Sequence, residues 1–220
     1  MLIPCYGATM DLSDLRREYA LSGLSEADLA TNPFVQFKQW FNEINVPETI
    51  DASAMVLATV DHQNRPHQRT VLLKSFSDEG FSFFTNYESQ KGLDIAANNN
   101  VNLTFAWYSL ERQVIISGQA EKVSEQESAE YFATRPRASQ IAAWVSRQST
   151  PVSKREHLSN TFDALSEEWG DKPIDKPPYW GGYIVKPTRF EFWQGRSSRL
   201  HDRLVFEKNG AEWVVGRLAP

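Results

Sequence analysis

The chain has almost none of the residues that build covalent or metal-based frameworks. Cys5 is the only cysteine among its 220 residues, so an internal disulfide cannot form. The four histidines are scattered, and no group of cysteines and histidines has the spacing of a zinc site. We therefore predict no bound metal and a reducing compartment, the cytoplasm.

Long apolar runs and excess basic charge are missing too. No apolar run approaches the roughly 20 residues that a membrane-spanning helix needs, and residues 1–10 lack the basic region that opens a signal peptide. Lys and Arg total 23 against 28 Asp and Glu, a net charge of −5. A mildly acidic chain is a poor general binder of nucleic acid, so we expect neither a membrane nor a nucleic-acid partner.

The sequence also lacks the common catalytic signatures. The patterns G-x-S-x-G, Walker A, G-x-G-x-x-G and H-E-x-x-H do not occur. These absences argue against the commonest hydrolases, NTPases and dinucleotide-binding enzymes. What the chain does have is ordinary globular composition, with 41% hydrophobic and 12% aromatic residues, which can bury a core without metal or disulfide.

Short β-prone runs joined by turn-length segments dominate the chain. Strands are predicted at 54–60, 67–76, 81–85, 101–108, 112–123, 181–194, 199–207 and 211–217. Helices are predicted at 11–19, from Pro33 to Ile44, at 89–98, at 124–147 with a break at Pro136, and at 153–169. The order predicts a mainly β fold, an antiparallel sheet closed into a barrel with flanking helices. We expect residues 11–220 to form one domain and residues 1–10 a flexible extension.

The first group of candidate functional residues lies where a strand turns into the helix at 89–98. The start of a helix offers free backbone N–H groups and a positive dipole end. Thr85, Ser89 and Lys91 at this turn, with Arg69 and Lys74 from the preceding strand, could form a phosphate cradle. The alternative is structural: Ser89 merely caps the helix and Lys91 is solvated.

A second group surrounds the helix break at Pro136. Tyr131 and Arg135 are four residues apart and share one helix face, and Ser139 follows the break. A phenol, a guanidinium and a hydroxyl are suitable donors for a second anion. The alternative is an exposed helix junction with a surface arginine.

The third group comes near the end of the chain. In a strand over 199–207, Arg199, His201 and Arg203 would project from one face, close to the aromatic ring of Trp193. Three such side chains repel one another unless an anion or carboxylates lie between them. The alternative is a solvated strand face.

Two weaker pairs complete the candidates. Gln148 and Ser149 follow Trp144 at an apolar helix end and could bind the polar edge of a ring. Arg16 and Tyr19 are three residues apart on the first predicted helix and could cover a pocket. With two candidate phosphate sites and no catalytic carboxylate pair, the pattern favours a phosphorylated cofactor and a phosphorylated substrate, with the cofactor carrying the chemistry.

Seven segments of the chain resemble the pyridoxamine 5′-phosphate oxidase family. They are RREY (16–19), QRTVLLK (68–74), FFTNYESQK (83–91), LERQV (110–114), YFATRPRASQIAAWVSRQS (131–149), FWQGRSSRLHDR (192–203) and RLAP (217–220). The resemblance implies an FMN-binding split β-barrel and a homodimer with FMN at the subunit interface. It also implies oxidation of pyridoxamine or pyridoxine 5′-phosphate to pyridoxal 5′-phosphate by O₂, with release of H₂O₂ and, from the amine, of ammonia.

The resemblance also implies roles for individual residues. The positions that match FMN contacts are Arg69, Val71, Leu72, Lys74, Phe84, Thr85, Gln90, Lys91, Gln113, Gln148, Ser149, Trp193 and Arg203. The positions that match substrate contacts are Arg16, Tyr19, Lys74, Tyr131, Arg135, Ser139, Arg199 and His201. Arg199 and His201 are the implied catalytic residues. One departure stands out: the family usually has a basic residue where this chain has Gln90, so one phosphate cation is missing.

Three other functions are consistent with parts of this pattern. A split-barrel FMN reductase with a nicotinamide donor would share the barrel segments but would not need the group around Arg135. A binding protein for FMN or pyridoxal 5′-phosphate would hold its ligand without turnover. An acidic scaffold protein would bind neither molecule.

Overall fold

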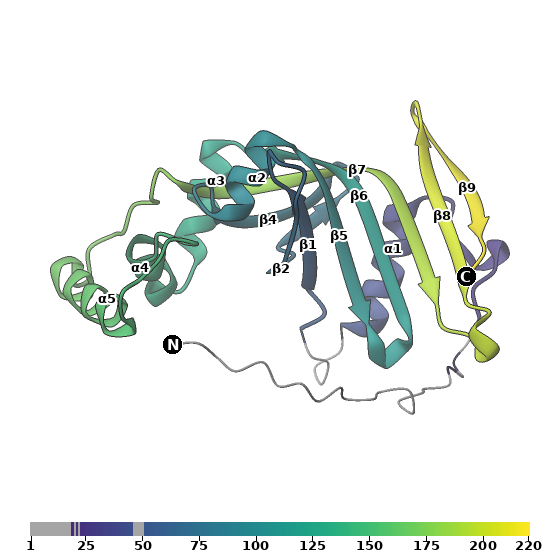
Figure 1. Cartoon of the computed structure of the whole chain (residues 1–220), viewed down its shortest axis with the longest axis horizontal. Helices are drawn as coiled ribbons and strands as arrows, with labels where there is room; N and C mark the ends of the chain where they lie inside the picture. Colours follow the sequence, from purple (N-terminus) through teal and green to yellow (C-terminus); the bar gives the residue numbers. More distant parts are fainter. Residues whose placement is uncertain (1–18, 20, 22, 46–50) are drawn as a thin grey trace.

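The computed structural model describes residues 19, 21, 23–45 and 51–220 of the chain, and within them one antiparallel sheet of nine strands dominates (Figure 1). The strands are β1 (Ala54–Val60), β2 (Pro66–Leu72), β3 (Ser75–Ser77), β4 (Gly80–Asn86), β5 (Asn100–Trp107), β6 (Arg112–Lys122), β7 (Trp180–Gln194), β8 (Asp202–Asn209) and β9 (Glu212–Leu218). Their order is β2-β1-β5-β6-β7-β4-β3, and β8 and β9 extend the sheet from β7. The predicted mainly β split barrel is confirmed.

The strand expected at 67–76 is in fact two strands, and this break shapes the sheet. β2 pairs with β1, whereas β3 pairs with β4 at the other end of the strand order. Between them, the Leu73 N–H donates to the Ser53 carbonyl and the Lys74 N–H to the Ser82 carbonyl, both at 2.9 Å. The prediction of a closed barrel is therefore wrong: the sheet curls until its two ends are joined by two residues, but β2 and β3 form no ladder with each other.

Helix α1 (Pro33–Ile44) closes one side of the curled sheet. The Asn32 side chain accepts from the Phe34 N–H at 2.8 Å, and Pro33 takes the first helical position. The Phe37 ring is fully buried and lies 4.9 Å from the ring centre of Phe81 and 5.0 Å from that of Phe105. The predicted aromatic stripe of this helix is confirmed as core, although Phe41 is only half-buried.

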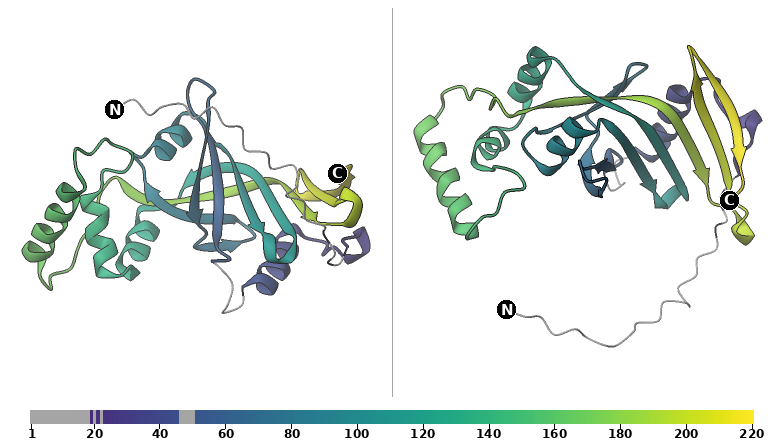
Figure 2. Two further views of the ribbon diagram at one scale, coloured as in Figure 1. Left: turned by 60° about the horizontal axis from the view of Figure 1, so that its bottom comes forward. Right: turned by 45° about the horizontal axis from the view of Figure 1, so that its top comes forward.

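The remaining helices gather at the other end of the molecule, where β7 begins (Figures 1 and 2). They are α2 (Gln90–Ala97), α3 (Glu125–Thr134), α4 (Arg137–Val145) and α5 (Arg155–Trp169). The predicted break at Pro136 is confirmed, because α3 ends at Thr134 and α4 begins at Arg137. None of the helices in the described ranges is both long and apolar enough to cross a membrane.

β7 connects the two ends of the molecule (Figure 1). It has 15 residues, pairs with β4 near Trp180, with β6 along most of its length, and with β8 near Trp193. At about 3.3 Å per residue, the 13 steps from Trp180 to Trp193 span roughly 40 Å. Residues placed at opposite ends of β7 are therefore far apart in one chain.

The chain after β7 departs from the predicted strand over 199–207. Ser197–Arg199 form a short 3-10 helix, η3, and β8 begins only at Asp202. Ser198 and Arg199 have φ angles of 56° and 60°, which a strand does not permit. The expectation that Arg199, His201 and Arg203 share one strand face is therefore wrong. The helix predicted at 11–19 and the extension at 1–10 lie outside the described residues, apart from Tyr19.

Candidate functional site

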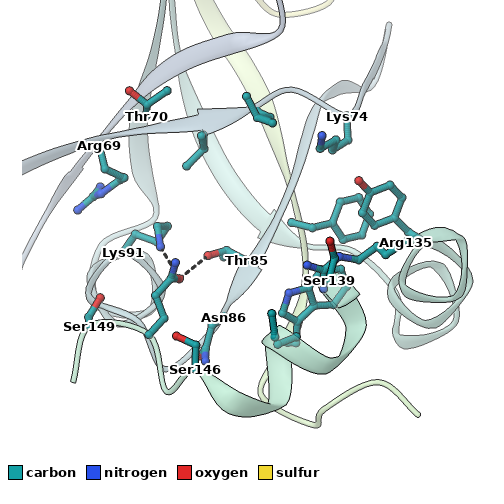
Figure 3. Close-up of a pocket in the computed structure, with 18 of the residues that line it drawn as sticks. Arg69, Thr70, Lys74, Thr85, Asn86, Lys91, Arg135, Ser139, Ser146 and Ser149 are labelled. Carbon is teal, nitrogen blue, oxygen red and sulfur yellow. Dashed lines mark hydrogen bonds between the residues drawn. The ribbon is translucent and has the colours of Figure 1, made fainter. Parts of the chain in front are cut away.

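A cavity of about 800 Å³ lies between β2, β4, α2 and the junction of α3 with α4 (Figure 3). It brings together thirteen of the predicted site residues: Arg69, Val71, Leu72, Lys74, Phe84, Thr85, Gln90, Lys91, Tyr131, Arg135, Ser139, Gln148 and Ser149. Four of these are cations, and no described residue that lines the cavity is a carboxylate. The cavity is therefore built for an anionic ligand.

Lys91 is the most buried of the four cations. Its side chain is 6% exposed, and Nζ donates to Gln148 Oε1 at 2.8 Å and to Ser89 Oγ at 3.1 Å. Burial, and then the charge of Arg69, lowers the pKa of the Lys91 ammonium to about 8. The alternative of a solvated Lys91 is therefore wrong. The alternative of Ser89 as a side-chain cap is wrong as well, because its hydroxyl donates back to the Asn86 carbonyl at 2.6 Å.

Arg69 and Gln90 lie beside Lys91 and have partners outside the cavity. Arg69 Nη1 donates to Thr59 Oγ1 at 2.7 Å and to the Leu57 carbonyl at 3.2 Å. Gln90 Nε2 donates to a carboxylate oxygen of Asp94 at 2.8 Å, while its backbone N–H donates to Ser149 Oγ at 3.2 Å. Both side chains are thus held by groups behind the cavity wall.

Aromatic rings form the opposite part of the cavity, next to Arg135. The rings of Phe84 and Tyr131 stack at 3.9 Å, and the ring of Trp180 lies 5.5 Å from that of Phe84 and nearly parallel to it. The Arg135 guanidinium sits 4.8 Å from the centre of the Trp180 ring. Ser139 follows at the first turn of α4. The alternative of a surface arginine at an exposed junction is therefore wrong.

Two buried donors in this cavity lack a partner. They are Nη1 of Arg135 and Nδ2 of Asn86, and no other buried side-chain polar atom in the described part of the chain is unpaired. Asn86 is 6% exposed and its Oδ1 is already used by the Glu88 N–H at 2.7 Å. An unpaired buried donor costs about 1–3 kcal/mol. Both residues line the cavity, although the two unpaired atoms are themselves shielded from solvent.

A second cluster of predicted residues lies at the far end of β7. Gln113 on β6 is the register partner of Trp193 on β7, which is in turn the partner of Arg203 on β8. The Trp193 ring lies 4.7 Å from the ring centre of His201 and 5.5 Å from that of Tyr19. Five predicted residues therefore meet on one surface, none of which lines the cavity.

Each polar side chain of this second cluster has a distinct environment. The Arg203 Nε–H donates to Glu191 Oε1 at 2.8 Å, so this guanidinium is fixed within its own chain. His201 Nδ1 accepts from the Arg196 N–H at 3.0 Å, which leaves Nε2 to carry the ring proton of the neutral form. Arg199 is exposed and forms no hydrogen bond or ion pair with the described residues. Arg16, the remaining predicted residue, lies outside the described residues.

Some cavity residues were not predicted from the sequence. Asn86 belongs to the turn that was singled out at 85–91, so its amide could have been found there. Trp180 and Ser146 carried no signal, because they enter the cavity only through the pairing of β7 with β4 and the path of the chain after α4.

Comparison with known proteins gives two family matches. Residues 46–167 match the model described as pyridoxamine 5′-phosphate oxidase. Residues 180–220 match the model described as the pyridoxine 5′-phosphate oxidase C-terminal dimerisation region. The second match covers β7, β8 and β9, the strands that carry Trp193 and Arg203.

Relatives of similar length share half of their residues with this chain. A protein from Shewanella sp. (strain MR-7), named pyridoxine/pyridoxamine 5′-phosphate oxidase, is 50% identical over 210 residues, which cover 96% of this chain and 99% of that protein. A protein from Hydrogenovibrio crunogenus named pyridoxine/pyridoxamine 5′-phosphate oxidase 2 is 50% identical over 212 residues, covering 96% of this chain and all of the relative.

Solved structures show the same architecture. PhzG from Burkholderia lata, solved with tetrahydrophenazine-1-carboxylic acid, superposes with a TM-score of 0.86 at 27% identity, over 93% of this chain and 100% of that chain. A pyridoxamine 5′-phosphate oxidase-related, FMN-binding protein from Nostoc punctiforme superposes with a TM-score of 0.70 at 17% identity, over 87% of this chain and 100% of that chain, which is a likeness of fold alone.

Proposed function

The chain belongs to the pyridoxamine 5′-phosphate oxidase family, and we propose that it oxidises pyridoxamine 5′-phosphate or pyridoxine 5′-phosphate to pyridoxal 5′-phosphate with FMN as cofactor. When bound, FMN would supply the two-electron acceptor and pass the electrons to O₂, which leaves as H₂O₂. With the amine substrate, water then hydrolyses the imine to the aldehyde and ammonia. The names of the relatives that share half of the sequence support this assignment.

One observation carries the proposal: a single cavity has two separate groups of anion donors and no described carboxylate. Figure 3 shows Arg69, Lys91 and Ser149 on one side and Lys74, Arg135 and Ser139 on the other. The first group would hold the phosphate of FMN. The second, with the hydroxyl of Tyr131, would hold the phosphate of the substrate.

The same two groups of donors fit FMN and the substrate in other respects. The two residues with an unpaired buried donor, Asn86 and Arg135, both line this cavity. The stacked rings of Phe84, Tyr131 and Trp180 give the substrate end a rigid wall. Preorganised donors of this kind bind without paying for rearrangement, which is how a protein orients a substrate against a cofactor.

The distance along β7 supports a homodimer. Gln113, Trp193 and Arg203 are proposed to contact the same FMN as Lys91, yet they lie at the other end of a strand that spans roughly 40 Å. A mononucleotide cannot reach from one end to the other. A complete site would therefore combine the cavity of one protomer with the second cluster of its partner, and the match of residues 180–220 to a dimerisation region supports this arrangement.

Within such a site, the chain's own residues position and polarise the substrate. Arg199, which is exposed and unpaired among the described residues, would clamp the substrate ring and polarise it. His201 would orient the substrate through Nε2, since its Nδ1 is already bound to the Arg196 N–H. Arg16 and Tyr19 would cover the ring. We propose residues 11–220 as the single domain that carries all of these functions.

One experiment tests the proposal as a whole. The purified protein should show the visible absorbance of bound flavin, and addition of pyridoxamine 5′-phosphate in air should produce aldehyde and peroxide in equal amounts. Flavin that is reduced anaerobically by NADPH but not by pyridoxamine 5′-phosphate would contradict it and favour a reductase. Bound flavin with no O₂ consumption would contradict it and favour a binding protein.

A further inference from the structure

Asp94 is a buried carboxylate directly behind the proposed FMN phosphate site. It lies on α2, one turn after Gln90, and is 1% exposed. Its Oδ2 accepts from the Thr59 hydroxyl at 2.6 Å and faces a ring nitrogen of His67 at 3.0 Å, and its Oδ1 accepts from Gln90 Nε2 at 2.8 Å. None of the roles assigned above includes this residue.

The carboxylate controls Arg69 through two contacts. Arg69 Nη2 lies 3.6 Å from Asp94 Oδ2. Thr59 Oγ1 accepts from Arg69 Nη1 at 2.7 Å while its own hydroxyl proton goes to Asp94, so Thr59 relays the orientation of the carboxylate to the guanidinium. Asp94 thus joins β1, β2 and α2 behind the part of the cavity wall that Arg69 and Gln90 form.

The charge of Asp94 makes this arrangement costly for an anion site. Burial raises the pKa of its carboxyl, but hydrogen bonds from Thr59, Gln90 and His67 outweigh burial and leave the pKa below its ordinary value. The group is therefore ionised at neutral pH and repels a phosphate held nearby. The negative charge of Asp94 favours phosphate binding only if fixing the neighbouring side chains gains more binding free energy than the repulsion costs.

We propose that Asp94 is a positioning residue of the phosphate site, fixing the Arg69 guanidinium through Thr59 and tying down the Gln90 side chain. This inference rests on the proposed binding of FMN. It assigns to Thr59 the part of a relay and to His67 the part of an outer support for the carboxylate. Lys91 needs no such support, because Ser89 and Gln148 already hold it.

The Asp94→Asn variant distinguishes a positioning role from a simple charge effect, because the two predict opposite changes in FMN affinity. Loss of a negative charge alone would tighten FMN binding, whereas loss of the fixed Arg69 would weaken it. We expect the dissociation constant of FMN to rise about tenfold, measured by quenching of flavin fluorescence on titration with apoprotein. The dissociation constant of riboflavin, which has no phosphate, should stay the same.

Variants of Thr59 and Arg69 test the route of the effect. Thr59→Val, which removes the relay hydroxyl, should weaken FMN binding several-fold, and Thr59→Ser should retain wild-type affinity. In an Arg69→Ala background, Asp94→Asn should weaken FMN binding less than it does in the wild-type background, because the part of its effect that passes through Arg69 is already lost. Asp61→Asn is the matched control: Asp61 is also buried and accepts from Gln63 and Arg65, but its contacts lie in the turn between β1 and β2.

The FMN titrations of these variants either overturn or support the role of Asp94. Equal or tighter FMN binding by Asp94→Asn overturns the inference, and so does equal weakening in the presence and absence of Arg69. If the wild-type protein binds FMN no better than riboflavin, the phosphate site itself is wrong, and the proposed function falls with the inference. Weakening of FMN alone, with wild-type affinity in Asp61→Asn and Thr59→Ser, supports the inference.

Discussion

The two ends of β7 carry two clusters of very different construction. The cavity end, around Lys91, is concave: Lys91 is buried and hydrogen-bonded to Gln148, although Lys74 in the same cavity is exposed. The cluster around Trp193 is an open surface, with Arg199 exposed and only its Arg203 guanidinium fixed by a carboxylate. In the proposed function each end is one half of a site, so neither end is complete within one chain.

This difference separates binding from chemistry. The cavity end has the groups proposed to hold phosphates, so the loss of one of them should first lower the affinity for FMN. The open end has the side chains proposed to act on the substrate ring, so its loss should first be seen in turnover. The region matched to a dimerisation model contains the open end, which supports the proposal that a second protomer completes the half-site.

The largest expected effect comes from the open end. Arg199→Ala should lower kcat by about 100-fold or more, as the loss of a single preorganised donor does in other enzymes, while the bound flavin per protomer stays near the wild-type value. Absorbance spectra and initial rates measure both quantities, and Arg199→Lys tests whether charge alone suffices. Unchanged turnover would remove Arg199 from the reaction.

At the cavity end we expect the reverse: a substitution should weaken FMN binding more than it lowers turnover. Lys91→Ala should raise the dissociation constant of FMN by about 10- to 100-fold, since a charge-assisted bond contributes about 1.5–3 kcal/mol. Turnover at saturating FMN should fall much less. Lys91→Arg, which keeps the charge, is the control. A Lys91→Ala protein that purifies with one flavin bound per protomer would contradict the proposed phosphate cradle.

The lowered pKa of Lys91 predicts that the stability of the apoprotein and the affinity for FMN depend on pH in opposite directions. The pKa of Lys91 in the apoprotein is lowered to about 8, against an ordinary value of 10.5 for a lysine in water. Between these values the unfolded chain binds more protons, so the apoprotein should gain stability as the pH rises through this window. In the proposed site FMN binds the protonated ammonium, so the affinity for FMN should fall above pH 8, by at most about tenfold per pH unit.

The pH dependence of apoprotein stability and that of FMN affinity should both be weaker in Lys91→Met, which keeps the length of the side chain but not the charge. Thermal unfolding of the apoprotein and FMN titrations from pH 7 to 10 measure them. An FMN affinity that is flat across this range in the wild-type protein would show that Lys91 does not meet the phosphate.

Mixing the Arg199→Ala and Lys91→Ala proteins tests whether the two ends of β7, one from each protomer, meet in a dimer. Arg199→Ala retains a good cavity, and Lys91→Ala retains a good open cluster, so each mixed dimer would contain one complete site. Random exchange of protomers should recover roughly a quarter of the wild-type sites at limiting FMN. No recovery, with exchange verified by mass, would show that both clusters act within one chain.

The two ends also differ in how far the sequence predicts them. The cavity was predictable because Thr85, Gln90 and Lys91 are neighbours in one turn, and the break at Pro136 places Arg135 and Ser139 together. The open end was predicted with the wrong backbone, because nothing in Arg-Ser-Ser-Arg indicates the positive φ angles of Ser198 and Arg199.

The carboxylate behind the cavity was not predictable at all. Asp94 acquires its role from the register of β1 on β2, which pairs Thr59 with His67 and brings both against α2. Such long-range pairing follows from tertiary packing, not from local pattern. The break after Leu72, which turns a predicted strand into the two ends of the sheet, was missed for the same reason.

The smallest expected effect concerns Gln90, the position where the family usually has a basic residue. Gln90 is exposed and its amide is bound to Asp94 at 2.8 Å, so an arginine there would gain a phosphate contact but would also pair with Asp94 one turn later. An exposed ion pair contributes about 0.2–1 kcal/mol. Gln90→Arg should therefore tighten FMN binding only about two- to fivefold, measured by the same titration, and an unchanged dissociation constant would show that Asp94 takes the whole of the new charge.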